Sequence, residues 1–286
     1  MFGFRSDGKK LKKVDPIIRF TTYIMPKRYD AQVEMVKEIR CEEMDKYIRE
    51  KNEQGIKLSY MHIVIAGLVR MYALRPKLNR FVMSGRVYRR NKIYISFTIK
   101  QKLIDDADEA TIKIAFTGHE SLMQIKDMID TEIAKNVKSL DKNSTVKTAN
   151  GFLKLPHFIL KPTLGFVKWL DKCGMMPKKI IEASPFHTSC FLTNMKSIGT
   201  NFVYHHIYDF GTTGLFVSMG KEKYEPCIDA FGKYEIGKVM KLGLVIDERL
   251  CDGLYYAKAI KIGTKHIQNP RLLEEGLKEV FTDPDA

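Results

Sequence analysis

The sequence predicts an α+β fold: a two-layer sandwich in which helices cover a mixed β-sheet. Helical periodicity and short β-branched runs follow one another irregularly along the 286 residues, without the regular strand–helix–strand order of a parallel α/β sheet. No internal repeat is present, and no linker is long enough to separate two domains. We therefore expect a single domain over residues 1–286.

Each element is placed by its hydrophobic period and by the residues that begin or end it. The expected strands span Gln32–Ile39, short runs between Arg80 and Phe116, Thr188–Asn194, Thr213–Met219 and Val239–Leu250. The expected helices span Cys41–Gln54, Ser59–Arg75, Glu120–Lys138, Gly253–Lys261 and Pro270–Phe281. Ser59 is an N-cap residue for an apolar helix that Pro76 ends, and we expect this helix in the core. The polar stretch Ser139–Ala149 is expected to be a loop.

A basic and apolar segment, FLKLPHFILKPTLGFVKWLDKCGMMPKK, holds the only tryptophan, Trp169. Its mixture of lysines and large apolar residues suits a helix that lies in a membrane interface. Pro156, Pro162 and Pro177 argue against one continuous amphipathic helix. We therefore expect short pieces that pack over the sheet, cover a substrate channel or lie in a subunit interface, and membrane contact through residues 152–169 is not favoured.

The chain carries 48 Lys and Arg against 34 Asp and Glu, a formal charge of +14, and an anionic partner would explain this excess. Nucleic acid, a membrane surface and a phosphate-bearing small molecule all fit. One basic and aromatic cluster contains Arg86, Arg89, Arg90, Lys92, Tyr88 and Tyr94. No helix-turn-helix, zinc finger or RNP-like motif accompanies it, so a solvated hairpin face is favoured over nucleic-acid binding.

Several classes of site are excluded by what the sequence lacks. The five cysteines are scattered, with no Cys-x-x-Cys pair and no Cys/His cluster at zinc spacing, so we expect neither a disulfide framework nor a metal. No secretory signal, membrane span or glycine-rich phosphate loop is found. A cytoplasmic location fits these features.

The segment VMKLGLVIDERLCDG is where the sequence begins to indicate chemistry. Strand alternation places Glu248 on the same face as Leu244 and Ile246. A carboxylate buried there would have a raised pKa and could accept a proton near neutral pH, unless a cation such as Arg249 pairs with it. The alternative is that the strand ends or bulges before Asp247 and leaves the carboxylate in solvent. Periodicity alone favours this alternative, because sequence defines strand ends poorly.

The run from Asp247 to Gly253, followed by LYYAKAI, resembles the His-x-x-x-Asp-Gly signature of the chloramphenicol acetyltransferase and dihydrolipoyl acyltransferase superfamily. The stretch SYMHIVIAGLVRMYALRPKLNRFV is similar to an early helix of that family, and TSCFLTNMKSIG to its FTISNLG-like strand. The resemblance covers most of Arg5–Phe281. It implies the superfamily's fold, acyl transfer between the thiol of coenzyme A and a second nucleophile, and trimers with active sites between neighbouring subunits.

By position, the resemblance assigns roles to individual residues. Asp252 and Gly253 match the Asp-Gly pair, which supports the local structure, and Thr193 matches the hydroxyl that donates a hydrogen bond to the oxyanion. Glu248 stands where the family has its histidine base. A carboxylate can take that role only if its surroundings raise its pKa by about two units or more.

Other residues near these motifs are candidates for supporting roles. His206, or its neighbour His205, could replace the missing histidine, although alternation lets only one of them face a pocket. The family pairs its signature aspartate with an arginine near the N-terminus, and here Arg19 is favoured over Arg28. Cys251 is expected to pack as a small apolar residue.

The resemblance thus predicts a divergent acyltransferase that uses coenzyme A or acyl-CoA as substrate and has a thiol, hydroxyl or amine as acceptor. The alternative is an inactive scaffold or regulatory subunit that kept the fold and lost the base. We expect a homotrimer without a lipoyl domain, a bound lipoyl group or a peripheral-subunit-binding domain. A lipoylated substrate would then arrive on another protein.

Overall fold

The computed structural model describes residues 5–100, 109–138, 150–228 and 231–286, so the predicted loop Ser139–Ala149 lies outside the described residues. The strands are β1 (Gly8–Lys10), β2 (Gln32–Arg40), β3 (Arg80–Met83), β4 (Arg86–Arg90), β5 (Ile93–Lys100), β6 (Glu109–Phe116), β7 (Cys190–Asn194), β8 (Leu215–Met219), β9 (Lys223–Ile228) and β10 (Tyr234–Asp247). The helices are α1 (Pro16–Ile24), α2 (Glu42–Glu53), α3 (Tyr60–Leu74), α4 (Leu122–Lys138), α6 (His157–Cys173), α7 (Lys178–Ala183) and α8 (Gly253–Gln268).

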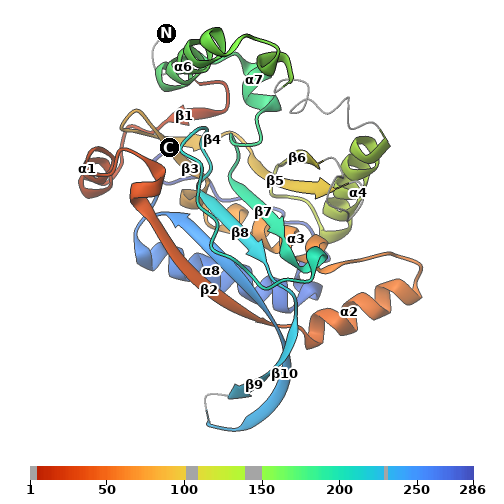
Figure 1. Ribbon diagram of the computed structural model, residues 1–286. Helices are drawn as coiled ribbons and strands as arrows, with labels where there is room; N and C mark the ends of the chain where they lie inside the picture. Colours follow the sequence, from red (N-terminus) through yellow and green to blue (C-terminus); the bar gives the residue numbers. More distant parts are fainter. Residues whose placement is uncertain (1–4, 101–108, 139–149, 229–230) are drawn as a thin grey trace.

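A mixed sheet in the order β2-β10-β8-β7-β5-β6 forms the centre of the molecule (Figure 1). Strand β7 runs parallel to β5 and β8, and the other neighbours are antiparallel. In the register, Ile246 of β10 pairs with Val33 of β2 and with Leu215 of β8. The first half of β10 pairs with β9 in a hairpin that projects from the body. The predicted α+β fold with a mixed sheet is confirmed.

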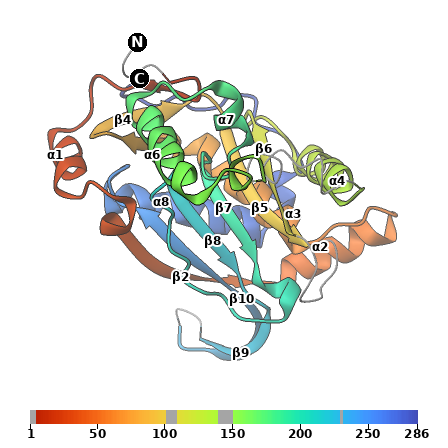
Figure 2. The same cartoon turned by 45° about the horizontal axis from the view of Figure 1, so that its top comes forward.

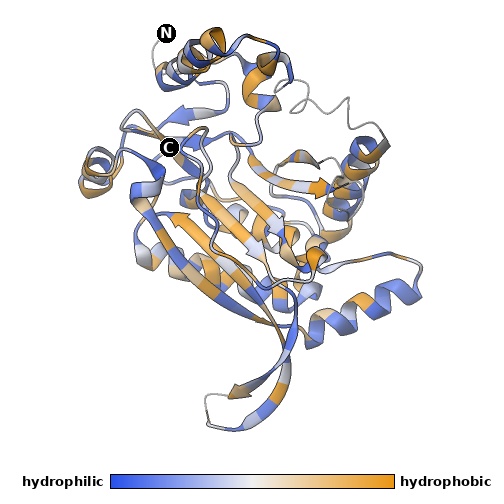
Figure 3. Cartoon of the chain, viewed as in Figure 1, coloured by the Kyte–Doolittle hydropathy of each residue, from blue (hydrophilic) through white to orange (hydrophobic). Residues whose placement is uncertain are grey.

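Helices α3 and α8 cover one face of this sheet. All but two residues of α3 are buried, as expected of an apolar helix in the core, and Ser59 is its N-cap residue. Alternate residues of β10, including Leu242, Leu244 and Ile246, join the same apolar core. Figure 3 shows the apolar colouring concentrated along the central strands. Alternation along β10 therefore decides which residues face the helices.

A chain segment without regular structure, residues 201–210, crosses the opposite face of the sheet, and we call it the strap. It lies against the strands because a glycine leaves room: a Cβ on Gly243 would lie 2.6 Å from the Val203 carbonyl oxygen. The Val203 N–H donates to Ser218 Oγ at 3.0 Å. Ile207 of the strap packs in a small apolar cluster with Phe191, Phe216 and Val245 of the strands.

A second sheet, β1-β4-β3, is joined to the C-terminal end of α6 by buried charges. The Arg5 guanidinium donates to Asp7 Oδ1 at 2.9 Å and to Asp171 Oδ1 at 2.8 Å. His187 Nε2 lies 3.1 Å from Asp171 Oδ2. Burial alone would raise the pKa of Asp171, but hydrogen bonds from His187 and Arg5 hold this pKa below its ordinary value.

The expectation that the prolines divide residues 152–179 is confirmed at Pro156 and Pro177, which directly precede α6 and α7, and is wrong at Pro162. Helix α6 is continuous over 17 residues from His157 to Cys173. Pro156 is its N-cap residue, where a missing N–H removes no helical hydrogen bond, and Pro162 lies inside the helix. The helix therefore tolerates the loss of one hydrogen bond at Pro162.

Two other helices differ from expectation. The predicted helix Pro270–Phe281 is limited to a 3-10 turn at Pro270–Leu273, because Arg70 binds the carbonyl oxygens of Leu272 and Glu275 that a continuing helix would need. Helix α1 was not predicted, although Asp15 caps its N-terminus and Pro16 follows. That pair of residues is a helix-start signal.

The C-terminal segment is fastened to β3 by a fully buried arginine, Arg80. Its Nε and Nη2 donate to the two oxygens of Asp283, both at 2.6 Å. We predict that Asp283→Ala lowers the free energy of unfolding by about 3 kcal/mol, because it leaves a buried guanidinium without its main partner. Urea denaturation would measure this loss. The control is Glu279→Ala, at an exposed position, and a loss no greater than that of the control would contradict the prediction.

Candidate functional site

Glu248 lies in the turn that joins β10 to α8. Strand β10 ends at Asp247, and the Glu248 side chain is exposed in the single chain. Its backbone N–H donates to the Ala31 carbonyl oxygen at 3.0 Å. The strand thus ends before Glu248, and one chain alone does not bury this carboxylate.

Arg249 does not pair with Glu248. Its Nη2 lies 2.7 Å from Asp247 Oδ2 and its Nε lies 2.8 Å from Asp247 Oδ1, and both side chains are buried. Its Nη1 donates to the Met25 carbonyl oxygen at 2.9 Å. The neighbouring cation is therefore used to hold the turn, and Glu248 makes no ion pair within the part of the chain that the structure describes.

Glu248 forms part of the wall of a groove of about 720 Å³ between α1, β2 and α8. The apolar part of the wall includes Ile17, Val33, Met35, Ile246 and Ile260. Lys37 of β2 and Lys261 of α8 supply positive charge, and Asp252 also lines the groove. Its volume lies within the range of small-molecule sites. Because Ile246 and Glu248 line the same groove, they lie on one side of the strand end, as alternation predicts.

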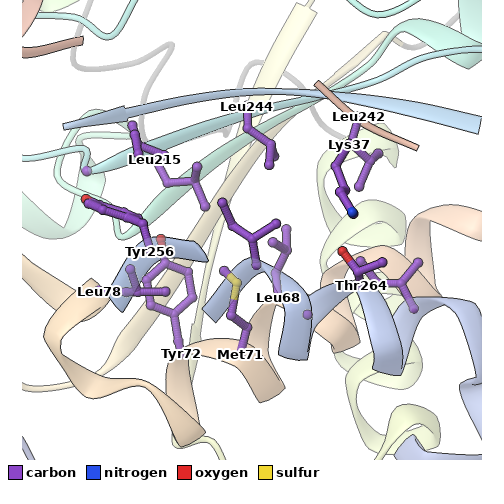
Figure 4. Close-up of a pocket in the computed structure, with 15 residues that line it drawn as sticks. Lys37, Leu68, Met71, Tyr72, Leu78, Leu215, Leu242, Leu244, Tyr256 and Thr264 are labelled. Carbon is purple, nitrogen blue, oxygen red and sulfur yellow. The ribbon is translucent and has the colours of Figure 1, made fainter. Parts of the chain in front are cut away.

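A smaller cavity lies between the sheet and the two core helices (Figure 4). Leu215 and Leu244 point from the sheet toward Tyr72 and Met71 of α3. Its volume of about 30 Å³ would hold a water molecule or two, and its lining is almost entirely apolar. The cavity is too small for an organic substrate, and we take the groove at Glu248, the larger of these two spaces, as the candidate ligand site.

Thr193 lies on the other face of the sheet. Its neighbour Leu192 belongs to the core under α3 and α8, so alternation turns Thr193 to the strap face. Along the sheet, Thr193 is level with Ser218 and Gly243, five residues before Glu248. At about 3.3 Å per residue, this separates Thr193 from Glu248 by roughly 16 Å along the strands. One chain therefore does not bring the two residues together.

The strap carries both candidate histidines. The His205 ring stacks on Phe216 with ring centroids 4.1 Å apart, and its Nδ1 lies 2.8 Å from the His206 carbonyl oxygen. His206 is exposed. Both histidines lie on the face of the sheet that carries Thr193, and neither lines the groove at Glu248.

Asp252 is the N-cap residue of α8. Its Oδ1 accepts a hydrogen bond from the Tyr255 N–H at 2.9 Å. Arg19 is exposed on α1 and makes no ion pair with any described residue, so the expected pair with Asp252 is not formed in the single chain. The other candidate, Arg28, is buried and donates to the carbonyl oxygens of Asp209 and Val82. Burial lowers the pKa of Arg28 to about 10.

Packing within one chain does not require a glycine at position 253. A Cβ added there would have no described atom within 4 Å. Cys251 is buried, and burial raises the pKa of its thiol to about 12, so it is protonated at neutral pH. The thiol therefore packs and does not act as a nucleophile.

The predicted basic cluster does not form one exposed surface, because Arg90 and Tyr88 are buried. The guanidinium of Arg90 lies 4.7 Å from the centre of the Phe81 ring. Among the described residues, no group of His, Cys, Asp and Glu could hold a metal ion. None of the described helices is both long and apolar enough to cross a bilayer.

Sequence reasoning missed most of the groove wall. Ile17 comes from the unpredicted helix α1, and Lys37 from the far end of β2. The cap signal at Asp15 and Pro16 could have located α1. No local signal joins α1, β2 and α8, because they meet only through the strand order of the sheet.

No protein-family model matches the sequence, and no curated protein matches it. Among solved structures, a probable dihydrolipoamide acetyltransferase from Listeria monocytogenes is 14% identical with a TM-score of 0.56, over 96% of this chain and 99% of the other. The cubic core of a pyruvate dehydrogenase multienzyme complex is 13% identical with a TM-score of 0.57, over 92% and 94%. A chloramphenicol acetyltransferase is 11% identical with a TM-score of 0.54, over 92% and 98%. The chain therefore has the fold of these acyltransferase catalytic cores.

Proposed function

We propose that this protein is a divergent CoA-dependent acyltransferase whose active site forms between two copies of the chain in a homotrimer. The observation that carries the proposal is the position of Glu248. Its carboxylate has no ion pair among the described residues and lies on the wall of a groove large enough for a small ligand. The acyltransferase-core fold supports this assignment.

In this proposal Glu248 of one copy is the general base. It removes a proton from the acceptor thiol, hydroxyl or amine, which attacks the thioester carbonyl carbon of acyl-CoA. Thr193 of a neighbouring copy donates a hydrogen bond to the oxyanion. The tetrahedral intermediate then collapses, the carbon–sulfur bond breaks, and the proton passes from Glu248 to the leaving CoA thiolate.

A neighbouring copy would also supply the desolvation that Glu248 needs. The carboxylate is exposed in the single chain, and the apolar Ile17, which lines the same groove, is 73% exposed. Covering this surface would remove water from the groove, and a desolvated carboxylate accepts a proton more readily than a solvated one. Lys37 and Lys261 could then bind the phosphates of CoA while the apolar wall contacts its pantetheine arm.

A second candidate function rests on the same exposure. If nothing covers Glu248, it stays a weak base, and the protein is an inactive scaffold or regulatory subunit that binds a partner chain. His206 is a further candidate base, on the face that carries Thr193. A lipoylated protein or a free small molecule would be the acceptor in the active case.

The first test is release of CoA thiol from acetyl-CoA and longer acyl-CoAs, with dihydrolipoamide or small amines as acceptors. We expect the wild type to be active, and Glu248→Gln and Thr193→Val each to lower kcat by a factor of about 100 or more. His206→Gln is the matched control and should keep most activity. An active Glu248→Gln with an inactive His206→Gln would transfer the role of base to the histidine. A wild type that is inert until Glu248→His is made would establish the scaffold.

Asp252 has a positioning role in this proposal, because its cap fixes the start of α8 beside Glu248. Asn caps helices as well as Asp does, so Asp252→Asn should leave the free energy of unfolding unchanged. Asp252→Ala should lower it by about 1 kcal/mol. Urea denaturation separates the two variants. An equal loss in both would show that the negative charge matters, as in an ion pair.

A further inference from the structure

Helix α6 is amphipathic, and its Phe and Trp side chains are exposed to solvent. Phe158 is 77% exposed, Phe166 56% and Trp169 48%. The rings of Phe166 and Trp169 are stacked, with centroids 5.7 Å apart. Figures 1 and 2 show α6 at the outside of the molecule, at the end opposite the β9–β10 hairpin. An exposed apolar patch of this kind often marks a contact with a partner protein or a membrane.

The lysines of α6 form a second stripe beside the aromatic one. At about 100° per residue, Phe158, Phe166 and Trp169 fall within a sector of roughly 80°. Lys161 and Lys168 fall in the adjoining sector, and both are exposed. Viewed along the helix axis, the lysine ammonium groups thus lie on one side of the aromatic rings.

The side of α6 that faces the protein is held by polar anchors near its C-terminal end. Asp171 lies opposite the aromatic stripe, is buried, and binds Arg5 and His187. The Lys172 carbonyl oxygen accepts a hydrogen bond from Ser84 Oγ at 2.9 Å. These anchors fix the rotation of α6 about its axis, so the aromatic stripe is held outward.

We propose that α6 binds the surface of an anionic lipid bilayer and lies in its plane. The aromatic stripe would enter the boundary between headgroups and acyl chains, and the lysines would extend to the lipid phosphates. This inference goes beyond the proposed acyl transfer and does not depend on it. The continuity of α6 through Pro162 supplies the single amphipathic surface that the sequence alone did not favour.

The charge of residues 152–183, a segment that includes α6 and α7, favours a bilayer over a second copy of the chain. Exposed lysines of the segment are Lys154, Lys161, Lys168, Lys172, Lys178 and Lys179. Its acidic residues are Asp171, which is buried and paired, and the exposed Glu182. A two-fold contact through α6 would place two such lysine clusters against each other, and their repulsion opposes it. A leaflet rich in anionic headgroups attracts them.

Trp169 gives the test a specific probe, because it is the only tryptophan in the chain. The full chain is mixed with vesicles of phosphatidylcholine, or of phosphatidylcholine and phosphatidylserine, at low and high salt. We expect a blue shift of the tryptophan fluorescence and protection from iodide only with the anionic vesicles at low salt. No shift with any vesicle would overturn the proposal.

Substitutions on the two stripes separate binding by α6 from binding elsewhere. Phe158→Ser should weaken vesicle binding about tenfold or more, and so should Lys161→Glu combined with Lys168→Glu. The matched controls are Tyr224→Ser, at a residue 76% exposed on β9, and Lys46→Glu combined with Lys57→Glu, at exposed lysines of another surface. The controls should bind like the wild type.

Two outcomes would contradict the assignment. Equal effects of the α6 substitutions and their controls would show that net charge alone drives binding. Self-association in the absence of vesicles, seen by sedimentation velocity and removed by Phe158→Ser, would show that a second copy occupies the helix.

Discussion

The buried ion pair between Arg249 and Asp247 holds the turn on which the candidate site depends. Asp247 ends the central strand β10, and its carbonyl oxygen accepts a hydrogen bond from the Tyr256 hydroxyl of α8 at 2.6 Å. Arg249 also binds the carbonyl oxygen of Met25, the C-cap residue of α1. One pair of charges thus joins the sheet to the two helices that form the groove. Because Asp247 and Arg249 pair with each other, neither of them pairs with Glu248, which lies between them in the sequence and can face a ligand.

Successive residues of a β-strand point to opposite faces of the sheet, and this alternation places the two main residues of the candidate site on different faces. Glu248 lies on the side of α8, and Thr193 lies on the opposite face, which also carries the strap and its two histidines. No side-chain movement within one chain can bring a carboxylate and a hydroxyl together through a packed sheet. The proposed chemistry therefore requires assembly, which would also cover the exposed apolar side chains around the groove. In the proposed function, catalysis would therefore depend on oligomerisation.

Much of the fold could be predicted from local patterns. Alternation and caps located β2, α2, α3, α4, β7, β8 and the second half of β10, and the Asp-Gly motif indicated the turn at Glu248. Strands β1 and β9 were not predicted. The failures have physical causes. Tertiary bonds from Arg70 end the C-terminal helix, and α6 continues through Pro162 although this residue has no N–H to donate. The groove wall could not be predicted, since Ile17 and Lys37 reach it only through long-range topology. Burial of Glu248 also depends on neighbours that one sequence does not specify.

The most direct test of the shared site is a mixture of two inactive variants. Glu248→Gln and Thr193→Val chains would be coexpressed with different tags, and assemblies that contain both would be purified. In each mixed trimer, about one site in three combines Glu248 of one chain with Thr193 of its neighbour. The account predicts that thiol release from acyl-CoA returns to about that fraction of wild type, while each variant alone stays inactive. Mixed assemblies as inactive as either parent would contradict it.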